Sequence, residues 1–149
     1  MDIMKELYFY VLFVALFAAQ TGLILGGVLE PMSSYSAGNI LFTGLVAAIA
    51  VYMGWGLSES GIKKVAIKGA IVAFVGVTVI ACASLIGYTI GKPVLGLTLP
   101  SAAYLVVPLL FILLLTIILY ASLAVLGVWV AQRFKSSQTK KNEAGSAKK

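Results

Sequence analysis

Four apolar stretches, each long enough to cross a lipid bilayer, make up most of this chain. They cover approximately residues 7–29, 39–57, 65–90 and 102–131. A spanning helix needs about 20 mainly apolar residues. The hydrophobic fraction is 61%, whereas soluble domains contain about 45–50%. The chain is therefore predicted to be an all-α integral membrane protein, a four-helix transmembrane bundle over residues 1–134 whose first helix is retained rather than cleaved as a signal peptide.

Ten of the eleven basic residues fall on one side of the predicted membrane. They precede the first apolar stretch, cluster between the second and third, and follow the fourth, whereas Lys92 stands alone between the third and fourth. Loops rich in lysine and arginine stay in the cytoplasm. We therefore expect both termini to be cytoplasmic and the membrane to be the plasma membrane.

Tyrosine and tryptophan residues are expected near both membrane interfaces, where their amphipathic rings are favoured. Those assigned to the cytoplasmic side are Tyr8, Tyr10, Tyr52, Trp55 and Trp129, and those assigned to the external side are Tyr35, Tyr88 and Tyr104. The two sets agree with four spans.

The last fifteen residues, 135–149, are rich in lysine and lack an apolar pattern. We expect them to form a disordered basic cytoplasmic tail. Its lysines are candidates for contact with anionic lipid or a partner protein, with nucleic acid as the alternative: Lys135, Lys140, Lys141, Lys148 and Lys149.

Small residues recur at spacings of three and four along the predicted helices, including the GxxxG pairs Gly22–Gly26 and Gly87–Gly91. Small side chains let helix backbones approach closely within a membrane. The candidate packing residues are Ala15, Gly22, Gly26, Gly44, Ala48, Gly54, Gly69, Ala73, Gly76, Gly87, Gly91 and Gly127. The spacing leaves open whether they contact other helices of this chain or another protein.

The connections and the fourth apolar stretch carry further expectations. The short turn near residues 58–61 predicts that the second and third helices are antiparallel neighbours. The bulky segment 105–115 and a kink at Pro108 suit a helix at the periphery of the bundle. The apolar loop 91–100 is expected to lie in the membrane interface or to cap a neighbouring subunit.

Few polar side chains lie within the predicted spans. Gln20 is expected to form a hydrogen bond across helices, and Thr21 and Thr78 are further candidates for polar contacts inside the membrane. The alternative is that Gln20, Thr21, Thr78 and Asn39 line a polar path.

Enzymatic chemistry is disfavoured because residues for acid–base, nucleophilic or metal chemistry are scarce. The chain has no histidine and one cysteine, Cys82, and it lacks phosphate-binding and nucleophile motifs. We expect no metal and no cofactor.

The sequence favours a non-catalytic membrane subunit that joins a larger complex, with other subunits or copies of itself, through small-residue helix faces. One alternative is a homo-oligomeric small transporter or channel. Another is a membrane-embedded coat or scaffold protein of a virion or vesicle, with its basic tail directed toward nucleic acid.

Overall fold

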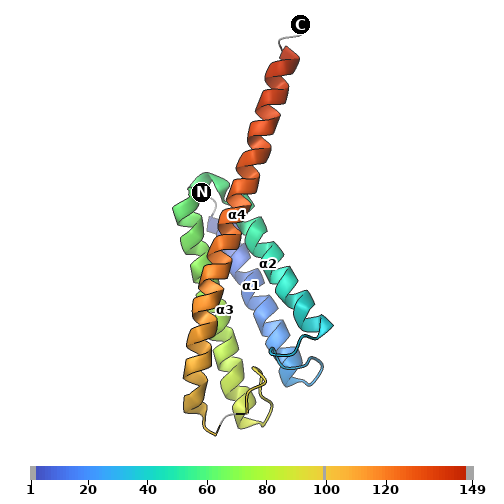
Figure 1. Ribbon diagram of the computed structural model, residues 1–149, viewed down its shortest axis with the longest axis vertical. Coiled ribbons are helices and arrows are strands. Elements are labelled where there is room, and N and C mark those ends of the chain that lie inside the picture. The colour runs from blue at the N-terminus through green and yellow to red at the C-terminus, as the bar shows by residue number, and fades with distance from the viewer. Residues whose placement is uncertain (1–2, 99, 147–149) are drawn as a thin grey trace.

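A computed structural model describes residues 3–98 and 100–146 of the chain. Within these residues the fold is all-helical, without strands (Figure 1). The elements are α1 (Ile3–Leu25), α2 (Ala37–Gly56), the 3-10 turn η1 (Ser58–Ser60), α3 (Ile62–Thr89), the 3-10 turn η2 (Ala102–Leu105) and α4 (Val106–Ser146). In the described part of the chain, four helices are long and apolar enough to cross a membrane.

Helix boundaries follow from local chemistry. α1 ends at Leu25, four residues before the predicted limit, because Gly27 adopts a φ of 78° that reverses the chain. Ser36 caps α2, its Oγ accepting a hydrogen bond from the backbone N–H of Asn39 at 3.3 Å. Gly61, with a φ of 85°, provides the bend that separates η1 from α3.

α4 extends far beyond the predicted fourth span. It is 41 residues long and continues as helix to Ser146, through most of the segment expected to be disordered. The expected boundary at residue 135 is therefore not a helix end. Lysine, the most frequent residue there, favours helix, and extending an existing helix is easier than nucleating a new one. Pro108 lies in the first turn of α4 rather than at an internal kink, a position where a missing N–H costs little.

The two ends of the bundle differ. The "loop end" carries the loops over residues 26–36 and 90–101, and the "basic end" carries the start of α1, η1 and the projecting part of α4 (Figure 1). The main helix contacts are α4 with α3 and α2, and α1 with α3 and α2. The prediction that α2 and α3 are neighbours is wrong, because these helices lie diagonally across the bundle despite the short turn between them.

α4 is divided into an exposed half and a packed half. Toward the loop end it exposes bulky residues such as Val107, Phe111 and Leu114. Toward the basic end, Tyr120, Ala124 and Val128 are buried between α2 and α3. The expected peripheral position therefore describes only the first half, since the small residues of the second half let α4 enter the bundle.

Aromatic rings connect α1 and α4, which, like α2 and α3, are not main neighbours. Phe13 and Phe17 of α1 each contact the ring of Tyr120 on α4, with centroids 6.1 and 6.4 Å apart. All three side chains are buried. This contact links α1 and α4 inside the bundle.

The loop over residues 90–101 folds back onto the helix bundle of the same chain. Val94 and Leu95 are buried, and the Met32 N–H donates to the Val94 carbonyl at 2.8 Å, which joins the two loops. The apolar side chains of this loop were expected to meet the interface or a neighbouring subunit. Val94 and Leu95 instead fill space at the loop end of this chain, where α2 diverges from α3 and α4 (Figure 1).

Candidate functional site

One group of the small residues packs inside the chain. A Cβ at Gly54 would collide with the carbonyl oxygen of Ala124, and a Cβ at Gly127 would collide with that of Val51. These two glycines lie on opposite sides of the α2–α4 crossing and bring the backbones into contact. Such close approach of glycine to a carbonyl is typical of Cα–H···O contacts between helices.

α3 makes equivalent contacts with its two neighbours. A Cβ at Gly69 would meet the backbone of Tyr120 on α4, and one at Gly76 would meet the ring of Phe17 on α1. Ala73, between them on the same face, is completely buried. α3 is thus held by small residues against both α1 and α4.

A second group faces outward. Ala15 and Gly22 are exposed on α1, on the side opposite the buried Phe13 and Phe17, and Gly26 is exposed just beyond the end of α1. A Cβ at Gly22 would meet no atom of the described chain within 4 Å, and a Cβ at Gly26 would meet mainly the carbonyls of Gly22 and Leu23 at the end of α1. The first GxxxG pair is therefore not used for packing between helices within the described part of this chain.

α2 repeats this arrangement. Gly44 and Ala48 are exposed, and a Cβ at Gly44 would meet no described atom within 4 Å. The buried residues of the same helix, among them Val46, Ala50 and Met53, face the bundle. α2 thus has small residues both at its crossing with α4 and on its outer face, whereas the small residues of α1 lie on its outer face.

The second GxxxG pair serves the loop rather than a helix crossing. A Cβ at Gly87 would collide with the carbonyl oxygen of Lys92, where the chain turns back after α3. Gly91 adopts a φ of 71° in that turn, and no atom of the described chain lies near its Cβ position. This pair allows the loop to fold closely over the end of α3.

A buried pair of amides connects α1 and α2 at the loop end. Gln20 Nε2 donates to Asn39 Oδ1 at 3.1 Å, across helices, and the two residues are only 6% and 5% exposed. Asn39 Nδ2 lies 3.2, 2.9 and 3.2 Å from the carbonyl oxygens of Glu30, Pro31 and Ser34. Asn39 therefore organises the first loop as well as the helix pair.

The two threonines do not join this pair. Thr21 is buried and donates to the Phe17 carbonyl of its own helix at 2.8 Å. Thr78 is exposed on α3 and donates to the Phe74 carbonyl at 2.9 Å. The four residues considered for a polar path are thus not brought together around one space.

Of the tail lysines, the structure describes only one side chain. Lys135 Nζ lies 2.9 Å from Glu59 Oε1 of η1, in an exposed ion pair between α4 and the turn. Lys140 and Lys141 lie on α4, but their side chains are outside the described part, and Lys148 and Lys149 lie outside the described residues. Arg133 stacks on the Trp129 ring, 4.7 Å from its centroid.

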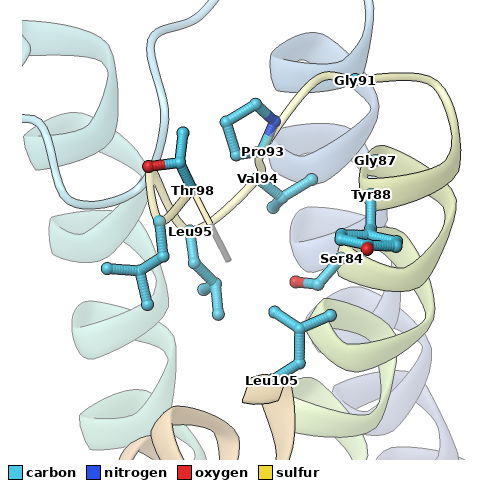
Figure 2. A pocket seen from close by; sticks show the side chains of 10 residues that line it. Ser84, Gly87, Tyr88, Gly91, Pro93, Val94, Leu95, Thr98 and Leu105 are labelled. Carbon is cyan, nitrogen blue, oxygen red and sulfur yellow. The ribbon is translucent and has the colours of Figure 1, made fainter. Parts of the chain in front are cut away.

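A cavity that the sequence did not reveal lies at the loop end (Figure 2). It has a volume of about 200 Å³ and is bounded by α3, the loop over residues 90–101 and Leu105. Ser84 points its hydroxyl into this space (Figure 2). A serine one turn from the end of an apolar helix gives no sequence signal of this kind, because the cavity exists only once the loop folds back.

Among the described residues, no three histidine, cysteine, aspartate or glutamate side chains lie close enough together to hold a metal ion. Comparison of the chain with protein families, with curated proteins and with solved structures finds no match.

Proposed function

We propose that this protein is a non-catalytic membrane subunit that joins a larger complex, made with other subunits or copies of itself, through the outward small-residue faces of α1 and α2. The observation that carries the proposal is the exposure of Ala15, Gly22, Gly44 and Ala48. In a membrane, bulky side chains suit contact with lipid, whereas small ones favour contact with another helix.

The small residues fall into an inner set and an outer set, and this separation supports the proposal. The glycines at the α2–α4 and α3–α4 crossings already hold the bundle together. The outward small-residue faces of α1 and α2 are therefore not required for packing within the bundle. A second, chemically similar set of small residues left outside has an evident use in a contact between proteins.

A transporter would require a polar path, and the arrangement of the polar residues favours the subunit instead. Gln20 and Asn39 satisfy each other and the first loop, and Thr78 lies on another surface. For Gln20→Leu we expect unchanged activity of the parent complex and no solute flux in liposomes carrying the protein alone. Flux that disappears with Gln20→Leu, while the assembly persists, would favour the transporter alternative over the subunit.

The proposed topology places both termini in the cytoplasm and the loop end outside, in the plasma membrane. Lys63, Lys64, Arg133 and Lys135 are exposed at the basic end, which suits the cytoplasmic side. Exposed aromatic rings lie near both ends of the bundle. Trp55 and Trp129 lie toward the basic end, and Tyr35, Tyr88 and Tyr104 lie toward the loop end. The projecting end of α4 is then available to anionic lipid or to a partner.

The assembly proposal is tested by native gel electrophoresis of mild-detergent extracts from cells that make the protein naturally. The chain alone has a mass of 15.7 kDa, so the tagged wild-type protein should migrate in a much larger species. Gly22→Leu and Gly44→Leu should each reduce that species, because leucine keeps the partner backbone away, while neither helicity nor the thermal stability of the single chain is reduced.

Ser122→Leu is the matched control, since Ser122 is an exposed small residue on α4, away from both faces. It adds comparable bulk and should leave the large species intact. A wild-type protein that migrates as a monomer, or a large species unaffected by leucine at both glycines, would contradict the proposal.

The topology is tested by labelling single cysteines on intact cells with a membrane-impermeant thiol reagent, in a Cys82→Ser background. Thr98→Cys at the loop end should react, and Ser137→Cys on α4 should react only after the cells are opened. The reverse pattern would invert the orientation.

A further inference from the structure

The cavity at the loop end contains a polar group without a protein partner. Ser84 is 3% exposed, and its Oγ makes no hydrogen bond to any described residue. Hydroxyls in membrane helices usually donate to a carbonyl of the preceding turn. Thr78 and Thr89 of the same helix do so, at 2.9 and 2.7 Å. Ser84 is the exception, and a buried donor without an acceptor is unfavourable.

The rest of the cavity is mainly apolar. Val94, Leu95 and Leu105 form its buried walls, and Figure 2 shows their side chains gathered around the Ser84 hydroxyl. Gly87 also borders the cavity, and because it has no side chain, Val94 and the Lys92 carbonyl pack closely against α3. One hydroxyl in such surroundings can orient a ligand that is apolar except for a single acceptor.

The cavity is accessible from the loop end. Gly91, Leu97 and Thr98 border it and are exposed. The Tyr88 hydroxyl, also at the border, lies 3.4 Å from the carbonyl oxygen of Pro100. A ligand can therefore enter without separating the helices.

We propose that this cavity binds an apolar group carrying a carbonyl oxygen, which accepts a hydrogen bond from Ser84 Oγ. The volume of about 200 Å³ sets the size of the group, since an apolar cavity of about 150 Å³ holds benzene. A six-membered ring with one carbonyl, or an ester with the adjoining part of an acyl chain, has the required bulk. Two sources supply such a carbonyl, a free ring ketone and a membrane lipid ester, and both present the same acceptor.

The test compares cyclohexanone with methylcyclohexane, rings of similar size of which only the first carries an acceptor. Binding to the full-length protein is titrated by saturation-transfer NMR in nanodiscs of ether-linked phosphatidylcholine. Ser84→Ala should weaken cyclohexanone binding about tenfold, the effect of about one net hydrogen bond, and leave methylcyclohexane binding unchanged. Because each ring partitions equally into nanodiscs of both proteins, partitioning cancels in this comparison.

Thr89→Val is the matched control. It removes a hydroxyl from the same end of α3 that is bonded to its own helix and does not line the cavity, so it should change neither affinity. Ser84→Ala removes only an unpartnered hydroxyl and should therefore fold normally.

Repeating the titration in ester-linked phosphatidylcholine distinguishes the two sources. A lipid ester that occupies the cavity lowers the apparent affinity for cyclohexanone, and Ser84→Ala reduces that competition. Equal affinities in both lipids assign the cavity to a free ring ketone. The proposal is overturned if neither ring binds saturably, or if Ser84→Ala leaves the preference for the ketone intact, as expected of a cavity that holds only water.

Discussion

The two ends of this bundle are held together by different interactions. At the basic end, α4 lies against α2 and α3 with glycines in contact with facing backbones, at Gly54, Gly69 and Gly127. At the loop end, α4 exposes bulky side chains, and the elements are connected by the Gln20–Asn39 pair, by the bond between the two loops, and by Lys92 Nζ donating to the Leu25 carbonyl at 2.9 Å.

The difference reflects what each end must satisfy. Regular helices satisfy their own backbone groups, so in apolar surroundings they gain most from close van der Waals contact. Where the chain leaves the helix, carbonyls such as those of Glu30 and Pro31 need donors, and the Asn39 amide supplies them. The basic end should therefore be sensitive to side-chain volume and the loop end to the loss of polar groups.

The largest expected effect is at the basic end. Gly54→Ala places a methyl group against the Ala124 carbonyl and should reduce the free energy of unfolding by about 3 kcal/mol, because the α2–α4 crossing must open. Gly44→Ala is the control on the same helix, with no described atom near its Cβ. It should be neutral or stabilise by up to about 1 kcal/mol through helix propensity. Unfolding in mixed detergent micelles, followed by circular dichroism, measures both, and equal effects would contradict the assignment of inner and outer faces.

A smaller effect is expected at the loop end. Asn39→Leu removes the donor to the first-loop carbonyls and the acceptor for Gln20, and should cost about 2 kcal/mol. Gln20→Leu removes only the bond across helices and should cost about 0.6 kcal/mol, and no more than about 2. The same unfolding measurement ranks the two variants. A larger loss for Gln20→Leu would mean that the helix pair, rather than the loop, depends on Asn39.

The smallest effect is expected for the ion pair between α4 and η1. Lys135 and Glu59 are 64% and 88% exposed in their side chains, so Glu59→Gln should change stability by less than about 1 kcal/mol. Added salt should reduce the difference further. A difference that persists in high salt would show that the turn is held by more than this exposed pair.

Prediction from sequence succeeded for properties that depend on the length and composition of contiguous segments. Four helices and an all-helical fold follow from the length and apolar character of the segments. Sequence patterns did not predict that α2 and α3 lie diagonally, that the loop over residues 90–101 folds back, or that α4 stays helical beyond residue 135. The first two depend on contacts between distant segments, and the third on the helix that precedes the tail.

The sequence by itself therefore determined how many helices form and which residue types are able to pack closely. Only the tertiary structure decided which small residues do so, with Gly54 and Gly127 inside and Gly22 and Gly44 outside. The physical reason is that a helix in apolar surroundings can be apolar on every side, so its hydrophobic pattern does not distinguish the inner face from the outer one. Which face lies inside is settled by how the backbones fit together, and the cavity beside Ser84 arises in the same way from tertiary structure, because the loop folds back over α3.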